Sequence, residues 1–297
     1  MESINKMKKL IKIKDLSKEE IIKILDLAKD IESEPSKYSD KLKDKVLANV
    51  FLEPSTRTRV GFSVAMQKLG GSVVDLLETK FKEGMGSPES FEDTFRVMSD
   101  YSDILTLRHP SENLVNEIQT DNVLINCGNG KDEHPTQTLI DLYAMKKEFG
   151  NIENLSIEIV GDLKNMRSAH SLVLALSYFN NIKITLTSPT ELKLPEKYLE
   201  NNDLDLSEIE NISLSNTDII YIAGFPPNKL VSEDKRLSYQ LNSSKINQLK
   251  ESSIILCPLP RVDEISKEVD KIKQAKYFEQ SKNGLFVRMA ILLNSFI

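Results

Sequence analysis

Short apolar segments alternate with amphipathic segments along most of this chain, and the alternation constrains the fold more than any other feature. In the first half it predicts strands at 46–52, 72–77, 104–108 and 122–127 and helices at 57–69, 89–101 and 135–147. A capping box at Ser17–Glu20 opens an earlier amphipathic helix. Strands that alternate with helices are typical of parallel sheets with helical crossovers.

The alternation resumes after a break near residues 149–151. It predicts strands at 155–160, 183–186, 218–222 and 253–256 and helices at 167–178 and 285–296, whereas 199–217 is polar and predicted to be loop. A chain of 297 residues has the length of about two domains. We therefore predict an α/β protein of two domains, each a parallel β-sheet flanked by helices.

Composition excludes several classes of function. The net charge of −6 argues against a nucleic-acid binder, whose surface would be basic. No apolar run approaches the roughly 18 residues that span a bilayer, and residues 1–14 lack the apolar core of a signal peptide. Cys127 and Cys257 lie far apart without metal-ligand spacing, which favours a reducing, cytoplasmic location.

Residues 53–59, Glu-Pro-Ser-Thr-Arg-Thr-Arg, join the first long strand to a helix. The free amides and the dipole at a helix start both favour an anion there. Arg57 can add a forked, charge-assisted contact. An ordinary N-cap would explain one hydroxyl, but it would not explain two arginines that flank a threonine. The segment therefore predicts a phosphate site.

Other polar clusters also follow predicted strands. Arg108-His109-Pro110 and His134–Gln137 come after strands of the first half, and 161–167 and 257–261 come after strands of the second. Ligands of open α/β sheets bind at the carboxyl ends of the strands. We therefore expect these clusters to form one site.

Taken together, these motifs resemble those of the aspartate/ornithine carbamoyltransferase family. The resemblance covers essentially the full length and is carried, in order, by 51–59, 108–110, 133–143, 161–172, 258–265 and 283–288. Glu53 and the run Pro-Leu-Pro-Arg-Val-Asp-Glu favour the aspartate branch. The resemblance implies a carbamoyl-phosphate domain at 1–148, to which the C-terminal helix 285–297 returns, and an amino-acid domain at 149–284.

The resemblance also implies a reaction. The carbamoyl group of carbamoyl phosphate passes to L-aspartate through a tetrahedral oxyanion and gives N-carbamoyl-L-aspartate and phosphate, a step of pyrimidine synthesis. The implied catalytic residues, which point donors at the carbamoyl oxygen, are Thr58, Arg108 and His134. The implied ligands of carbamoyl phosphate are Ser55, Thr56, Arg57, Thr58, Arg108, His134, Gln137, Pro258 and Leu259, and those of the amino acid are Arg167 and Leu259. The leaving phosphate can accept the proton, so no metal or cofactor is expected.

Other side chains near these motifs have structural interpretations. We expect His109 and His170 to be structural, and Cys257, where the family usually has histidine, to be a small buried residue. In the implied arrangement Arg288 ties the C-terminal helix to the first domain, although a solvated helix arginine is an equal alternative.

The chain departs from the family pattern in two places. A loop that a neighbouring subunit donates in the family carries a serine and a lysine, but Glu83 and Ser87 occupy those places in 79–89. Lys80 or Lys82 could substitute only if the loop refolds. After the strand at 218–222 the family has Thr-Arg-x-Gln, whose arginine grips the substrate carboxylate, whereas this chain has 223–227, Ala-Gly-Phe-Pro-Pro.

These departures leave three hypotheses open. The chain is an aspartate carbamoyltransferase with altered loop chemistry, a carbamoyltransferase for another amine, or a weakly active or inactive paralogue that keeps the fold for assembly or ligand sensing. Lys229, Lys235 or Arg236 could supply the missing pocket charge. The resemblance further implies a homotrimer with shared active sites, with regulatory chains as a possible addition.

Overall fold

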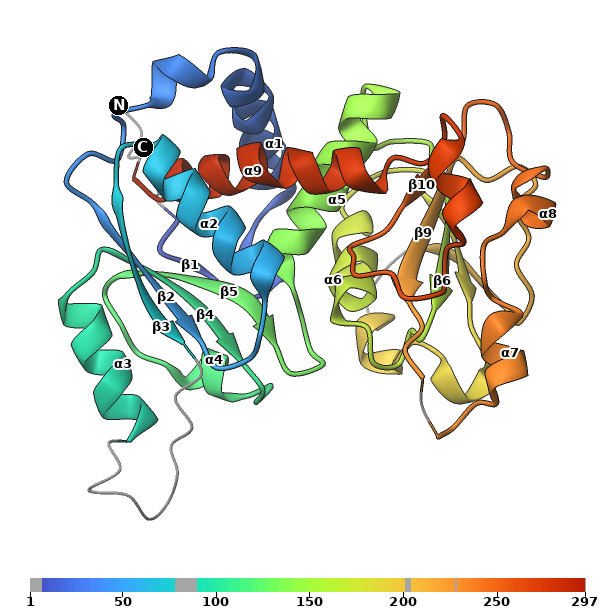
Figure 1. Cartoon of the computed structure of the whole chain (residues 1–297), viewed down its shortest axis with the longest axis horizontal. Helices are drawn as coiled ribbons and strands as arrows, with labels where there is room; N and C mark the ends of the chain where they lie inside the picture. The colour runs from blue at the N-terminus through green and yellow to red at the C-terminus, as the bar shows by residue number, and fades with distance from the viewer. Residues whose placement is uncertain (1–6, 78–89, 201–203, 228, 297) are drawn as a thin grey trace. The chain divides into compact units, whose positions relative to one another are not determined.

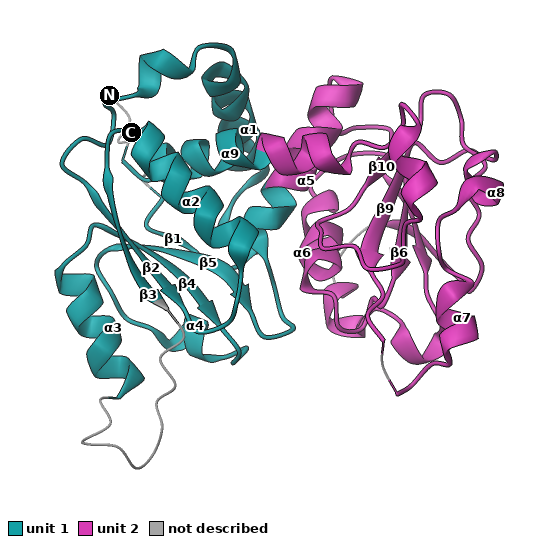
Figure 2. Cartoon of the chain, in the orientation of Figure 1, with its two compact units in different colours: residues 1–139, 284–297 teal, residues 140–283 magenta. Residues whose placement is uncertain are grey.

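The computed structural model describes residues 7–77, 90–200, 204–227 and 229–296. The chain divides into two compact units, residues 1–139 with 284–297 and residues 140–283 (Figure 2). Each unit holds a five-stranded sheet whose strands are all paired in parallel, with helices packed around it (Figure 1). The predicted fold class is confirmed.

The first unit is built on a sheet of order β1-β5-β4-β2-β3. Its strands are β1 (Lys9–Leu10), β2 (Val46–Phe51), β3 (Ser72–Leu77), β4 (Ile104–His109) and β5 (Val123–Asn129). Its helices are α1 (Lys18–Ser33), α2 (Thr56–Lys68), α3 (Phe91–Asp100) and α4 (Leu114–Glu117). The sheet is buried under these helices, and one core cluster joins Ala48, Leu105 and Leu124 of its three central strands to Phe95 of α3.

The second unit is built on a sheet of order β10-β9-β6-β7-β8. Its strands are β6 (Ser156–Gly161), β7 (Lys183–Thr187), β8 (Asp205–Ile209), β9 (Ile219–Gly224) and β10 (Ile254–Leu256). Its helices are α6 (Arg167–Leu176), α7 (Glu233–Leu237) and α8 (Ser243–Ile246). Two helices, α5 (Pro135–Phe149) and α9 (Tyr277–Asn294), contribute residues to both units.

Local sequence signals explain where several helices begin. The Ser17 hydroxyl accepts from the Glu20 amide at 3.2 Å while the Glu20 carboxylate accepts from the Ser17 amide at 2.8 Å, so the predicted capping box is confirmed. Ser90 caps α3 in the same manner, with its hydroxyl 3.0 Å from the Asp93 amide. Side-chain caps of this kind stabilise a helix by about 1 kcal/mol.

Three sequence-based predictions of elements are wrong or incomplete. Residues 199–217 are not all loop, because Asp205–Ile209 form the edge strand β8, which pairs with β7. The C-terminal helix begins at Tyr277 instead of 285. The short elements β1, α4, α7 and α8 were not predicted.

Candidate functional site

Three adjacent strands of the first unit end at or shortly before the residues predicted to bind the anion. These residues are the motif at 53–59, Arg108 and His134. In the order β5-β4-β2, Phe51 is the register partner of Arg108, and His109 is the partner of Asn129. The Leu52 amide also donates to the Arg108 carbonyl at 2.9 Å. Because the strands are parallel, their polar continuations meet at one edge of the sheet.

Helix α2 begins without a side-chain cap. Ser55 occupies the N-cap position, but its side chain makes no capping hydrogen bond, in contrast to Ser17 and Ser90. Thr58 is buried, whereas the Arg57 side chain is exposed. The Ser55 side chain therefore leaves the start of α2 uncapped, and the start of an uncapped helix favours an external acceptor such as a phosphate oxygen.

Arg108, at the end of β4, is held by two groups of the same unit. Its Nη1 donates to the Cys127 carbonyl at 3.2 Å, and its Nε lies 3.4 Å from Oε2 of Glu53. The Arg108 side chain is only 15% exposed. The guanidinium is thus fixed in orientation beside the start of α2, as a donor to a developing negative charge must be.

His134 precedes α5 and is almost fully buried. Its carbonyl accepts from the Gln137 amide at 3.0 Å and the Thr138 amide at 3.2 Å, so His134 is held directly before the first residue of the helix. The Thr136 hydroxyl lies 3.2 Å from Nδ1 of the His134 ring. With Nδ1 engaged by the hydroxyl, the orientation of the His134 ring is fixed.

Buried side-chain amides in the second half of β5, and a carboxylate in the loop before His134, form a scaffold that sequence reasoning missed. The Asn126 side chain donates to the Asn129 side chain at 2.8 Å and accepts from the Gly128 amide at 2.8 Å. The Glu133 carboxylate accepts from the Ile13 amide at 2.9 Å. The sequence signal was a run of polar residues that begins inside a buried strand and continues after it, and buried polar groups of this kind must form hydrogen bonds.

Arg288, in the first-unit part of α9, is buried with 6% of its surface exposed. The centre of its guanidinium lies 5.7 Å from the centroid of the Phe62 ring, and its Nε makes no hydrogen bond within the part of the chain that the structure describes. Burial, with a smaller contribution from the positive charge of Arg57, lowers the pKa of Arg288 to about 10. The prediction of a solvated helix arginine is therefore wrong.

The second unit brings its own polar clusters together at the ends of β10, β9 and β6, which are also adjacent. Arg167 begins α6 after β6 and is half-buried. The preceding turn is fixed by the Asp162 carboxylate, which accepts from the amide and the side chain of Asn165 at 3.1 and 2.9 Å. Pro258 and Leu259 follow β10, and Leu259 has a φ of 52°.

Where the family carries its pocket arginine, this chain has Gly224, which contributes backbone contacts and no side chain. Gly224 ends β9 with a φ of 109°, and its carbonyl accepts from the Asp162 amide at 2.9 Å. Gly161 lies opposite with a φ of 140°, and a carbon added to it would come within 2.4 Å of the Gly224 carbonyl oxygen. Only glycine tolerates such a close approach at these φ values.

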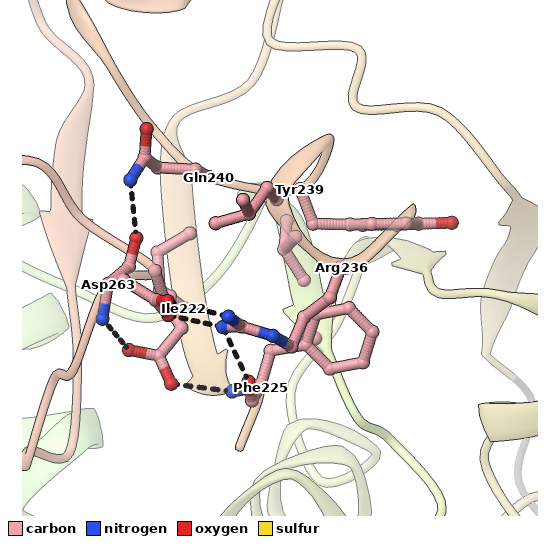
Figure 3. A pocket seen from close by; sticks show the side chains of 10 residues that line it. Ile222, Phe225, Arg236, Tyr239, Gln240 and Asp263 are labelled. Atoms are coloured by element: carbon pink, nitrogen blue, oxygen red, sulfur yellow. Dashed lines mark hydrogen bonds and ion pairs between the residues drawn. The ribbon is translucent and has the colours of Figure 1, made fainter. Parts of the chain in front are cut away.

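A cluster of charged side chains holds the segment after β9 (Figure 3). The Glu264 carboxylate accepts from the amides of Phe225 at 2.8 Å, Val262 at 2.6 Å and Asp263 at 3.2 Å. Arg236, 7% exposed, pairs with Asp263 through both terminal nitrogens and contacts the Phe225 carbonyl at 3.5 Å. This pairing raises the pKa of Arg236 and lowers that of Asp263.

The loop after β10 is anchored by a buried polar chain. The Cys257 amide donates to Oε1 of Gln280 at 2.9 Å, and the Gln280 side chain donates to Asp141 at 2.6 Å. Tyr221 donates to the same carboxylate at 2.9 Å. Burial raises the pKa of the Cys257 thiol to about 12, and the residue is 2% exposed, which confirms the prediction of a small buried residue.

The two remaining histidines have structural partners, as predicted. Nδ1 of His109 accepts from the Ser111 amide at 2.9 Å, and its ring contacts Phe91. The His170 ring stacks on Tyr198 with centroids 4.2 Å apart, and its Nε2 lies 2.8 Å from the Leu163 carbonyl. Burial lowers the pKa of His109.

The residues proposed to replace the missing loop lysine lie outside the described part of the structure, and two of those proposed to replace the pocket arginine are paired with carboxylates. The loop 79–89, with Lys80, Lys82, Glu83 and Ser87, lies outside the described residues. Lys235 pairs with Glu210 at 3.4 Å, and Arg236 is engaged by Asp263, so neither is presented as a free pocket charge. Among the described residues, no cluster of three or more metal-ligating side chains occurs, and no helix there is long and apolar enough to cross a membrane.

Comparison with known proteins covers both units. Residues 8–147 match the family model of the aspartate/ornithine carbamoyltransferase carbamoyl-P binding domain, and 153–294 match that of the Asp/Orn binding domain. The chain is 42% identical to the aspartate carbamoyltransferase catalytic subunit of Methanococcus maripaludis, over 96% of this chain and 97% of that protein. The corresponding protein of Methanocaldococcus jannaschii is 44% identical with the same coverage.

Solved structures give the same result. The catalytic subunit of the M. jannaschii aspartate transcarbamoylase has a TM-score of 0.89 at 41% identity and covers 97% of this chain and 98% of its own. The Trypanosoma cruzi aspartate transcarbamoylase, in complex with carbamoyl aspartate and phosphate, has a TM-score of 0.89 at 29% identity and covers 98% of this chain and 96% of its own. Two family models that together span most of the chain, and relatives above 40% identity along nearly all of it, lead to one conclusion: this chain belongs to the aspartate/ornithine carbamoyltransferase family.

Proposed function

We propose that this chain transfers the carbamoyl group of carbamoyl phosphate to L-aspartate, giving N-carbamoyl-L-aspartate and phosphate. One observation carries the proposal from the structure: the Ser55 hydroxyl and the first-turn amides of α2 are uncommitted to capping, beside an oriented Arg108. The names of the relatives, aspartate carbamoyltransferases at 40–44% identity, support aspartate as the acceptor.

In this proposal the phosphate group binds at the start of α2. Ser55, Thr56, Arg57 and Thr58 supply hydroxyl, amide and guanidinium donors to its oxygens. Thr58, Arg108 and His134 donate to the carbamoyl oxygen, where negative charge develops as the amine attacks. Gln137, three residues beyond His134 on α5, binds the carbamoyl amide.

The amino group of aspartate forms a bond to the carbamoyl carbon and gives a tetrahedral oxyanion. The oxyanion then collapses, the bond from carbon to the phosphate oxygen breaks, and the phosphate leaves with the proton that the amine loses. Each donor aimed at the oxyanion contributes roughly 3 kcal/mol to the lowering of the barrier. In the second unit the proposed substrate ligands are Pro258, Leu259 and Arg167, with Arg167 as the ligand of a substrate carboxylate.

We further propose a homotrimer in the cytoplasm, in which 1–148 with 285–297 binds carbamoyl phosphate and 149–284 binds the amino acid. Exposed apolar side chains on the edge strand β3, on α3 and at the residue that follows α3 support a protein partner: Val74 is 42% exposed, Val97 41% and Tyr101 72%. The two buried free cysteines fit a reducing compartment. A mass in solution of about three chains of 33.7 kDa would support the trimer.

The test is product formation by the purified protein with carbamoyl phosphate and L-aspartate, followed as carbamoyl aspartate and as released phosphate. Arg108→Met should lower kcat by a factor of about 100 or more if Arg108 stabilises the oxyanion. Because Gly224 stands where the family carries arginine, a panel of other amino acids and amines belongs in the same assay. Turnover with another amine, and none with aspartate, would refute the proposed acceptor while leaving carbamoyl transfer intact.

A further inference from the structure

Arg288 is a buried charge that the reaction proposed above does not use. The side chain is 94% buried, and its Nε has no hydrogen-bond partner within the described ranges of the chain. Within the described ranges, the contacts found for the Arg288 guanidinium are with the Phe62 ring and with the helix at Gly61, and neither brings a negative charge. A buried guanidinium without a negatively charged partner destabilises the ligand-free protein. A bound anion would supply the compensating negative charge.

The surroundings of Arg288 point to the start of α2. A side-chain carbon added at Gly61 would lie 2.7 Å from Nη1 of Arg288 and 3.0 Å from its Cδ, so the guanidinium packs directly on that helix. Gly61 is three residues past Thr58, which is roughly 4.5 Å along the helix axis at a rise of about 1.5 Å per residue. The absence of a side chain at 61 makes the room that the guanidinium occupies.

Arg288 also lies in a region of like charge. Its electrostatic neighbours include the positive charge of Arg57, and the Cys127 side chain lies in the same neighbourhood. Arg108 contacts the Cys127 backbone, with its Nη1 3.2 Å from the carbonyl oxygen, and of these arginines it also has the Glu53 carboxylate near it, 3.4 Å from its Nε. Arg57, Arg108 and Arg288 therefore place three guanidinium groups near the end of β5 and the first half of α2. Convergent like charges raise the free energy of the empty site and lower that of a site that holds a dianion.

We propose that Arg288 is an electrostatic positioning residue for the phosphate group, whose buried charge, packed against Gly61 of α2, stabilises a dianion at the start of that helix. The inference rests on the proposed function only in that the anion is carbamoyl phosphate or its product, phosphate. Arg288 is not assigned direct contact with the reacting atoms, and its role is exerted through the potential at the site.

The experiment compares the full-length protein with Arg288→Met, which removes the charge but keeps an unbranched side chain of similar reach. Calorimetry measures the dissociation constants of inorganic phosphate and carbamoyl phosphate, and thermal unfolding without anions measures stability. Arg288→Met should bind both anions about tenfold more weakly, because a nearby charge is lost. Its unfolding midpoint should stay unchanged or rise, because an unpaired buried charge is removed. In turnover, KM for carbamoyl phosphate should rise more than kcat falls.

Three further variants sharpen the test. Arg288→Lys keeps the charge and should restore most of the affinity. Gly61→Ala displaces the guanidinium without removing it and should weaken anion binding severalfold. Lys68→Met, which removes an exposed charge at the far end of the same helix, should bind both anions as the unaltered protein does.

A lower unfolding midpoint for Arg288→Met, with unchanged dissociation constants, would overturn the inference and make Arg288 a packing residue of α9. A failure of the unaltered protein to bind either anion would instead overturn the proposed function, and this inference with it. Anion binding that depends on Arg288, in a protein without turnover of aspartate, would support the inference while refuting the proposed acceptor.

Discussion

Replacing Glu264 with alanine should destabilise the second unit more than any substitution of an exposed carboxylate. The Glu264 side chain is almost fully buried and accepts from three backbone amides, those of Phe225, Val262 and Asp263, at 2.8, 2.6 and 3.2 Å. It thereby ties the segment after β9 to the loop after β10. Both segments flank the proposed amino-acid site.

The magnitude follows from the amides left behind. A hydrogen bond to a charged group contributes about 1.5–3 kcal/mol, and a buried donor left without a partner costs about 1–3 kcal/mol. Since these segments are near the surface and water can reach some of the amides, we expect a loss of about 3 kcal/mol for Glu264→Ala. For a unit of this size that loss corresponds to a fall of about 8 °C in its unfolding midpoint.

Thermal unfolding followed by circular dichroism measures the effect, with Glu251→Ala as the matched control. The Glu251 side chain is 88% exposed and pairs with Lys273 at the surface, so its removal should change stability by no more than about 0.5 kcal/mol. Assays of the folded protein at low temperature should also give a higher KM for the amino acid. A Glu264→Ala protein that unfolds within about 1 °C of the control would refute the reasoning.

Three other predictions follow from the same contacts. Ser55→Ala should leave the unfolding midpoint unchanged and weaken phosphate binding about tenfold by calorimetry, whereas Ser17→Ala should cost about 1 kcal/mol and leave binding intact, because only Ser17 caps its helix. Pairing with Arg236 lowers the folded-state pKa of Asp263, and pairing with Arg261 lowers that of Asp270. The two pairs therefore stabilise the fold fully above the unfolded pKa of about 3.9, and this stabilisation is lost as the pH falls below that value. In the double Asp→Asn variant the unfolding midpoint should fall less steeply with decreasing pH. Burial raises the pKa of the Cys257 thiol to about 12, so a thiol reagent at pH 8 should label Cys257 only after unfolding; rapid labelling of the native protein would contradict this burial.

Much of the first unit could be predicted from the sequence because its signals are local. Apolar runs such as 46–52 and 104–108 are long enough to be strands, and parallel pairing then brings the residues after them to one edge. That is why the segments that carry Ser55, Arg108 and His134 could be predicted to start at the same edge of the sheet. The state of Arg288 could not be predicted, because its burial depends on Gly61 and Phe62, more than 200 residues earlier in the chain.

The missed elements have a different cause. In β8 the side chains of Asp205, Ser207 and Glu208 are exposed at the edge of the sheet, so the strand carries no apolar pattern. The early part of α9 was missed for the opposite reason, because beyond Tyr277 the residues that it buries are polar. Gln280 binds Asp141 and the Cys257 amide, and Asn283 accepts from Lys147 at 3.2 Å. Periodicity detects apolar faces, and it fails where hydrogen bonds satisfy a buried polar face.

The end of β9 depends both on residues that are distant in the sequence and on buried polar contacts. It also bears on the acceptor substrate. From the sequence, Gly224 looks like the simple loss of an arginine side chain. In the structure its φ of 109° and its carbonyl contact with Asp162 mean that the backbone itself is arranged for glycine. Arg236 and Glu264 then hold the following residue, Phe225, from both its carbonyl and its amide. The segment is therefore a packed alternative to the family arrangement, and putting arginine at 224 would strain β9 before it could bind a carboxylate. An acceptor that this chain carbamoylates must obtain its carboxylate contacts elsewhere, which makes Arg167 the first second-unit side chain to vary in the assay.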